Sequence, residues 1–162
     1  MRNRFAAALG IGIALAGILV ATILFMQRGA RVGITGSMLK VRIAPLDENS
    51  SIAVVDFRFA NPSNVDFVVR NVTVVLEEKD GKQYDGRTIS EMDAKRLFEG
   101  IPLLGQKFNE TLVMNSKIPA HSSEDRMVAA RFEAPEARLE SRKRLLVRVE
   151  DVDGPVSEIP EK

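Results

Sequence analysis

The residues best suited to catalysis are few and do not form a catalytic pattern. His121 is the only histidine, and it lies beside Ser122 and Ser123 in a turn-rich stretch that begins at Pro119. A serine nucleophile needs a histidine base and an orienting carboxylate, which the fold normally brings together from separate segments. Asp125 is merely a sequence neighbour of these residues. We therefore expect no catalytic triad and interpret His121 as an exposed loop residue.

Metal chemistry would need clustered oxygen, nitrogen or sulfur ligands. The stretch from Asp151 to Gly154 has the alternating carboxylates and the glycine that begin a calcium loop, but a third ligand and the distal glutamate are missing, so a hairpin turn is favoured. The chain has no cysteine, which excludes disulfides and thiolate sites. Four further carboxylates are scattered along the sequence: Asp47, Asp56, Asp66 and Asp93. We predict a protein that is not an enzyme and has no catalytic, cofactor-binding or metal residues; a carboxylate-based metal-binding domain remains an alternative.

The charge distribution argues against nucleic acid as a partner. All 22 acidic residues follow residue 31, together with 19 of the 23 basic ones, so the part beyond residue 31 is mildly acidic. Nucleic-acid binding normally needs a concentrated basic face. The densest basic stretch, residues 138–148, is interleaved with glutamates, a mixture typical of a solvated edge. Binding of this stretch to anionic lipid headgroups is the alternative.

An apolar run near the N-terminus predicts a membrane anchor. Phe5 to Met26 contains 22 residues and no charge. As a helix this run would reach about 33 Å, enough for a hydrocarbon core of about 30 Å. A cleaved secretory signal is the alternative, but residues 25–30 do not have small residues at the spacing that cleavage requires. We therefore predict that residues 1–31 are a basic tail and an uncleaved transmembrane signal anchor, with the lipid bilayer as partner of Phe5 to Met26.

The orientation of this anchor follows from a nearly balanced set of charges. Arg2 and Arg4 precede the apolar run, and Arg28 and Arg31 follow it. The positive-inside rule counts both sides. Because a short basic tail before a first apolar segment typically stays in the cytoplasm, we predict a single-pass membrane protein with a cytoplasmic N-terminus and a periplasmic or extracellular domain.

After a flexible exit at residues 32–37, residues 38–162 are expected to form one domain. Alternating apolar and polar residues predict two half-buried strands, residues 39–43, closed by Pro45, and residues 53–59. A longer strand over residues 67–77 is interrupted by Arg70, which indicates a bulge. Further strands are predicted at residues 84–89, from 111, at 128–132 and at 145–150. About seven antiparallel strands favour an all-β immunoglobulin- or fibronectin-III-like sandwich, preceded by the single transmembrane helix.

Turn and capping residues separate these strands. Asn61, Pro62 and Ser63 end one strand, because proline lacks the N–H that a ladder needs and asparagine favours turns. Asp80–Gly81 predicts a tight hairpin in which both central residues take positive φ. Ser90 and Asp93 resemble a capping box, which predicts the one helix of the domain. A charged bend is expected over residues 136–143.

The chain resembles the late-embryogenesis-abundant group 2 family and its relatives with the water-stress-and-hypersensitive-response (WHy) domain. The resemblance covers roughly residues 37–150 and rests on the strand before the Asn61 turn, on the strand over residues 67–76, and on a set of turn residues. These residues are Asn61, Pro62, Ser63, Asp80, Gly81, Gly86, Ile118 and Pro119. The family usually has asparagine where this chain has Ser63. The resemblance implies a sandwich without catalysis, associated with stress protection or membrane-anchored accessory roles.

The expected function is therefore a non-enzymatic, membrane-anchored β-sandwich module. It would act in protein interaction or stress protection at the cell envelope, with a protein partner that no motif identifies. A structural subunit of an envelope assembly is the alternative.

Overall fold

The computed structural model describes residues 2–27 and 33–162, and within the first range it describes the side chains of residue 9 and residues 11–22. The chain divides into two compact units, Met1–Arg31 and Val32–Lys162. The predicted flexible exit, residues 32–37, falls partly on residue 32, which lies outside the described residues. The rest of that stretch is described, and Thr35 already belongs to the first strand.

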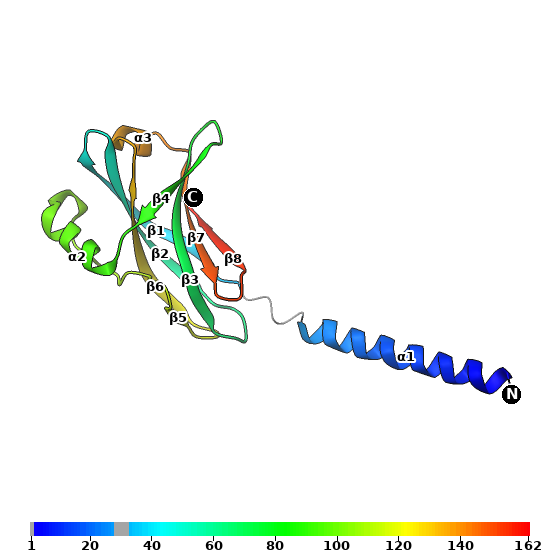
Figure 1. The fold of residues 1–162 in the computed structure, drawn as a ribbon. Coiled ribbons are helices and arrows are strands. Elements are labelled where there is room, and N and C mark those ends of the chain that lie inside the picture. Colours follow the sequence, from blue (N-terminus) through cyan, green and yellow to red (C-terminus); the bar gives the residue numbers. More distant parts are fainter. Residues whose placement is uncertain (1, 28–32) are drawn as a thin grey trace. The chain divides into compact units, whose positions relative to one another are not determined.

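The first unit is a helix, α1, which extends from Arg2 to Gln27 (Figure 1). Its described large apolar side chains are all 55–66% exposed: Leu9, Ile11, Ile13, Leu15, Ile18, Leu19 and Val20. Phe5 and Met26, the predicted ends of the membrane span, belong to this helix, but their side chains lie outside the described set. A search of the described residues found no helix whose length and hydropathy suffice to cross a membrane.

The second unit is built on one curled antiparallel sheet. Its strands, among the described residues, are β1 (Thr35–Asp47), β2 (Ser50–Ala60), β3 (Phe67–Glu77), β4 (Gln83–Thr88), β5 (Lys117–Ile118), β6 (Ser123–Phe132), β7 (Arg144–Asp151) and β8 (Val156–Pro160). The strands follow the order β1-β2-β6-β4-β3-β7-β8, and β5 pairs with the start of β3. The helical segments of this unit are α2 (Glu91–Gly100), α3 (Glu136–Glu140) and the 3₁₀ turn η1 (Pro102–Leu104). The expected antiparallel, strand-rich fold is confirmed.

The curl brings the first strand beside the last and encloses the main core. The Ile34 N–H donates to Ser157 Oγ at 3.0 Å, which ties the start of the domain to β8. Inward side chains of β2 and β6 meet those of β3 and β7, and Phe57, Phe59 and Phe67 are fully buried among them. Burying a large apolar side chain contributes roughly 1.5–3 kcal/mol, so this cluster is the main source of stability.

A second, smaller core lies on the outer face of β2 and β6. Ile52, Val54, Met127 and Ala129 point outward from these strands and are covered by Leu104 and by apolar side chains of α2. The second predicted strand, residues 53–59, was expected to be half-buried, and that prediction is wrong. It is buried on both faces over almost all of β2, because the α2–η1 segment covers its outer side.

The predictions near Arg70 and at Ser90 are confirmed. The register between β3 and β7 shifts between Val69 and Asn71, which is the bulge expected near Arg70. Ser90 caps α2, where its Oγ accepts a hydrogen bond from the Asp93 N–H at 3.2 Å. In both cases the signal is local in the sequence.

Other local predictions are wrong. Pro45 does not close β1, which continues to Asp47 through a register shift. Thr111 starts no strand and forms one isolated parallel bridge to Met127. At the Asp80–Gly81 hairpin, Gly81 alone has positive φ (86°), and the Glu78 N–H donates to Lys82 O at 2.9 Å, so the loop has three residues rather than two. The bend after Pro135 contains α3, a helix that was not predicted. The hairpin turn favoured at Asp151–Gly154 is confirmed, because the tail forms β8 and pairs with β7.

Candidate binding site between strands β4 and β6

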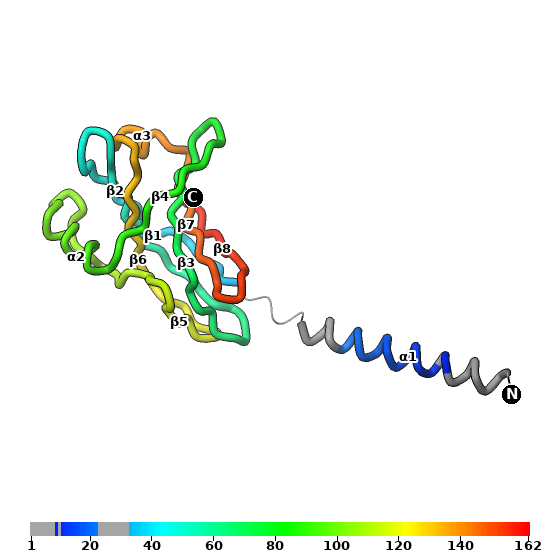
Figure 2. Tube along the Cα trace, viewed as in Figure 1, coloured from blue at the N-terminus to red at the C-terminus, as the bar shows by residue number. Residues whose placement is uncertain are grey.

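A notch opens in the sheet where β4 changes partner. Gln83 to Gly86 pair with the end of β3, whereas Arg87 and Thr88 pair with Arg131 and Ala130 of β6. The trace in Figure 2 shows β4 running from the β3 hairpin towards β6. Since the two strands diverge above the Arg87–Arg131 pair, they leave a cavity of about 280 Å³, lined by Leu76, Tyr84, Asp85, Arg87, Arg131–Ala134 and Arg138.

The wall of the notch is fixed by the close approach of Gly86 and Phe132. A Cβ atom on Gly86 would lie 2.5 Å from Cζ of Phe132 and under 3.0 Å from two further ring atoms. Phe132 is 3% exposed, so its ring cannot easily move away. Glycine at this position therefore lets the ring lie against the β4 backbone. In the sequence, Gly86 was singled out only by the family resemblance. The contact with Phe132 explains why a glycine is needed at this position.

Two arginines face each other at the base of the notch. Arg87 and Arg131 are directly opposite in the antiparallel register, so their side chains leave the sheet on the same face. Arg131 leans towards the β1–β2 turn, where it contacts Ser50 Oγ at 3.2 Å and Asp47 at 3.7 Å. The exposed Arg87 forms no ion pair and no side-chain hydrogen bond within residues 33–162. Like charges in this arrangement are destabilising, and Arg87 leaves a positive charge available.

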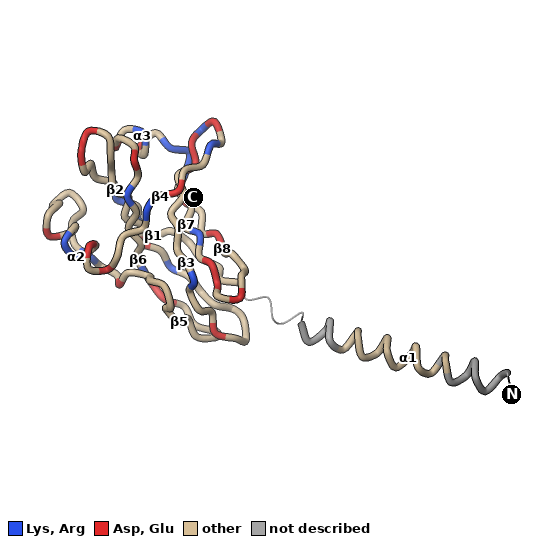
Figure 3. The backbone as a smooth tube through the Cα atoms, in the orientation of Figure 1, with Lys and Arg blue, Asp and Glu red and all other residues tan. Residues whose placement is uncertain are grey.

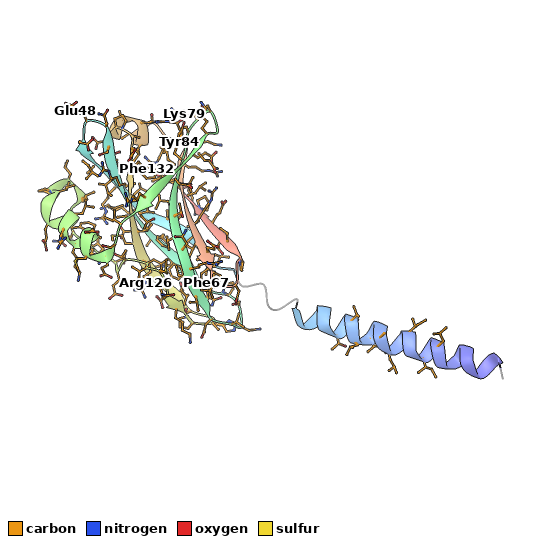
Figure 4. All side chains as sticks on the ribbon, in the orientation of Figure 1. Glu48, Phe67, Lys79, Tyr84, Arg126 and Phe132 are labelled. Atoms are coloured by element: carbon orange, nitrogen blue, oxygen red, sulfur yellow. The ribbon has the colours of Figure 1, made fainter. Side chains whose placement is uncertain are left out.

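The other wall carries the single tyrosine of the chain. Tyr84 is 37% exposed, and the Arg138 guanidinium lies 4.4 Å from its ring centroid, an arrangement that favours a cation–π contact. Arg138 also donates to Glu78 at 2.5 Å, which raises the pKa of Arg138. Figure 4 labels Tyr84 and Phe132 near this end of the domain. The notch thus combines an aromatic wall with an unpaired guanidinium.

Acidic residues at the rim balance part of this charge. Asp85 is highly exposed, with 71% of its side chain accessible, and its cationic neighbour is Arg148 at 3.9 Å. Glu133 is exposed on the β6 side. Lysines, arginines and acidic residues are interspersed over the whole domain, as Figure 3 shows. The three arginines against two carboxylates leave the notch lining with a small positive excess.

A second arginine site lies under the α2–η1 segment and is closed. Arg42 is 8% exposed and its Nη2 contacts Asp56 Oδ2 at 2.6 Å. Its Nη1 donates to the carbonyl oxygens of Leu104 and Gln106 at 2.6 and 2.7 Å. The amide of Asn109 donates to Asp56 Oδ1 at 2.8 Å. This network binds the covering segment to β1 and β2, and we call it the Arg42 clamp.

The predicted motif residues around Asn61 meet in space. The buried Asn61 amide donates to the carbonyl oxygens of Val65, Ile118 and Pro119 at 2.8–3.2 Å. Its Oδ1 accepts hydrogen bonds from the N–H and the hydroxyl of Ser63. Asn61 therefore connects the β2–β3 turn to the segment before β6. This arrangement is structural and brings no reactive groups together.

The remaining candidate residues lie apart. His121 has positive φ (55°) and its Nε2 lies 2.8 Å from Asn64 Oδ1 in an exposed turn. Asp151 is buried, and it accepts hydrogen bonds from the N–H groups of Val68 and Asp153, which fixes the β7–β8 turn.

Each carboxylate considered for a metal has its own partner. Asp47 bonds Ser50, Asp56 bonds Arg42, Asp66 bonds Lys117, and Asp93 bonds Ser90. Over the described part of the chain, no three His, Asp or Glu side chains gather in a way that could hold a metal ion.

Sequence reasoning missed both arginine sites, for different reasons. The Arg42 clamp had a visible signal, since Asp56 follows the apolar run from Ile52 to Val55 and precedes Phe57. The Arg87–Arg131 pair had none, because it depends on the register between strands separated by more than forty residues.

Comparisons with known proteins add no relative. No protein-family model matches the chain, and neither curated proteins nor solved structures contain a significant match to it.

Proposed function

We propose that the chain is a non-enzymatic, membrane-anchored module that contacts another protein at the cell envelope. The observation that carries the proposal is α1. Its described apolar side chains, from Leu9 to Val20, are more than half exposed and belong to a sequence run of 22 uncharged residues. Such a surface is costly in water and favourable in a lipid bilayer. In this proposal the N-terminus is cytoplasmic and the domain is periplasmic or extracellular.

The proposed form of the domain is an immunoglobulin- or fibronectin-III-like sandwich. One layer would be β1, β2 and β6, the other β3, β7 and β8, with β4 crossing between them. The supporting observation is that inward side chains from both sets of strands share one core. Sandwiches of this class present loops and strand edges to partners, which suits an interaction module.

The α2–η1 segment offers the surface for a protein contact. Two of its large apolar side chains are strongly exposed, Met92 at 64% and Leu103 at 77%. Phe108, in the loop that follows η1, is 64% exposed. The Arg42 clamp holds the backbone of this segment in place through Leu104 and Gln106. Apolar side chains displayed on a fixed backbone are typical of protein contact surfaces.

The anchor is tested by fractionation of cells that express the full chain or a variant lacking residues 1–31. The full chain should remain in the membrane fraction after alkaline carbonate extraction, and the shortened variant should be soluble. Release of the full chain by carbonate would contradict the anchor.

The protein contact is tested by site-specific photo-cross-linking in intact cells. A photoreactive residue at position 103 should yield a reproducible adduct, and Phe108→Ser should reduce its yield. The matched control places the same probe at Val156, which is also exposed but lies on β8. The same adducts from both positions, or no adduct from position 103, would contradict the proposal that this surface contacts a partner protein.

Stress protection is the second candidate, favoured by the meeting of Asn61 with Ile118 and Pro119, residues on which the family resemblance rests. The purified full chain should then preserve a labile enzyme through drying better than an equal mass of albumin. Equal or poorer protection would remove this candidate.

A further inference from the structure

The notch between β4 and β6 combines features that a domain built for stability alone would avoid. Arg87 and Arg131 face each other across paired strands, and Arg87 has no compensating carboxylate among the described residues. Phe132, which belongs to the main core, and the partly exposed Tyr84 line the same cavity where the two strands diverge. A like-charge pair next to an aromatic wall suits a ligand with one anionic end and one apolar end.

We propose that this notch binds a small organic oxyanion, a carboxylate or a phosphate carried on an apolar or aromatic body. The oxyanion would lie at the Arg87 guanidinium, whose fork of N–H donors matches both groups. The apolar body would lie against Tyr84 and Phe132. A cavity of about 280 Å³ is at the small end of the range for ligand sites, so the ligand is a single-ring or short-chain molecule.

The notch and the point where the chain enters the domain lie at opposite ends of the sheet. The notch lies at the end of the sheet where β3 ends and β6 ends, near Leu76 and Ala134. The chain enters the domain at the other end, where Ile34 bonds Ser157 at the start of β8. The inference goes beyond the proposed function and holds whether or not α1 spans a membrane.

The single tyrosine makes the notch directly observable. Because the chain contains one tyrosine and no tryptophan, 3-fluorotyrosine labelling of the full chain gives one fluorine resonance, which reports on Tyr84. The labelled protein, in a neutral detergent, is titrated with phenylacetate, phenyl phosphate, inorganic phosphate and the uncharged phenylacetamide. Comparison of phenylacetate with phenyl phosphate shows whether the notch prefers a carboxylate or a phosphate. Inorganic phosphate tests the need for the apolar body, and phenylacetamide tests the need for the charge.

At least one aromatic anion should shift the resonance with saturation, and phenylacetamide and inorganic phosphate should each bind at least about tenfold more weakly. Arg87→Gln should weaken the binding of the same anion by at least about tenfold. The matched control is Arg96→Gln, which removes an exposed arginine of α2.

Arg87→Gln also separates lost binding from lost folding. It removes one of two facing like charges, so the variant should unfold at the same temperature as the wild type or slightly above it. Three results would overturn the proposal: no saturable shift with either aromatic anion up to tens of millimolar, equal binding of phenylacetamide, or unchanged binding by a folded Arg87→Gln variant. Equal binding of inorganic phosphate would overturn the assignment of Tyr84 and Phe132 to an apolar body.

Discussion

The two arginine sites of the domain use the same side chain in opposite ways. Arg42 is buried, with its guanidinium bonded to Asp56, Leu104 and Gln106. Arg87 is exposed, faces another arginine and has no such partner within residues 33–162. A buried and paired charge fixes a structure, because moving either partner leaves the other uncompensated. An exposed and unpaired charge that faces a like charge costs stability and remains free to bind.

The comparison also separates two roles of the residues around each site. Beside Arg42, the ring of the partly buried Phe98 lies 4.9 Å from the guanidinium carbon and helps to exclude water. Around Arg87, the aromatic Tyr84 remains open to solvent. The first site is expected to control stability, and the second to control ligand binding with little effect on stability.

Breaking the Arg42 clamp should have the largest effect. Asp56→Ala leaves a buried guanidinium without its carboxylate, and the free energy of unfolding should fall by about 3–5 kcal/mol. Urea unfolding followed by Tyr84 fluorescence measures the change. The matched control is Asp125→Ala, which removes the exposed Arg58–Asp125 pair of neighbouring strands and should cost no more than about 1 kcal/mol. Equal losses in the two variants would mean that burial does not distinguish these ion pairs.

Filling the space at Gly86 tests the wall of the notch. Gly86→Ala places a methyl group within 3.0 Å of the buried Phe132 ring, and overpacking of this kind costs about 1–3 kcal/mol. The same unfolding assay applies. Gly100→Ala, at the end of α2 with open space around the added methyl group, serves as the control and should be close to neutral. Phe132→Leu should partly rescue Gly86→Ala, and a loss that persists unchanged would exclude the ring as its cause.

Acid should weaken the domain partly through Glu77, at the end of β3. Lys143 and Arg144 donate hydrogen bonds to its carboxylate at 2.6 and 2.7 Å and hold the pKa of Glu77 below its ordinary value. Since the folded pKa is depressed, this stabilisation is present above the unfolded pKa of about 4.3 and is lost as pH falls through the folded value. Between pH 7 and pH 3, the free energy of unfolding should therefore fall less steeply for Glu77→Gln than for the wild type. The exposed Glu99→Gln should follow the wild type, and a Glu77→Gln profile parallel to the wild type would contradict this contribution.

Removing the unpaired arginine should have the smallest effect on stability, with the opposite sign. Arg87→Gln relieves a like-charge pair, and such pairs change stability by about 0.2–1 kcal/mol. The variant should be as stable as the wild type or slightly more stable at low salt, and the difference should shrink as salt screens the repulsion. A clear loss of stability would show that Arg87 has a structural role like that of Arg42.

Some local patterns in the sequence predicted local structure correctly, whereas those at Pro45, Thr111 and Asp80–Gly81 did not. The break at Arg70 and the cap at Ser90 each depend on neighbours within a few residues, and both are confirmed. Long-range pairing was not predictable in this way. The burial of both faces of β2 depends on a segment that lies some forty residues later, and the facing of Arg87 and Arg131 depends on the path of β4. The structural motif around Asn61 could be found from its residue types, whereas the notch could not.

The central claim is that a membrane anchor holds a binding domain outside the cytoplasm, and cysteine accessibility tests it most directly. The chain has no cysteine, so each single-cysteine variant carries one reactive thiol. Glu99→Cys places it on the exposed end of α2, and Asn3→Cys places it in the basic tail. The labelling uses intact cells, or spheroplasts where an outer membrane is present. A membrane-impermeant maleimide should label Glu99→Cys in these cells. It should label Asn3→Cys only after detergent has permeabilised the membrane. Labelling of Asn3→Cys with protection of Glu99→Cys, or protection of both until permeabilisation, would contradict the account.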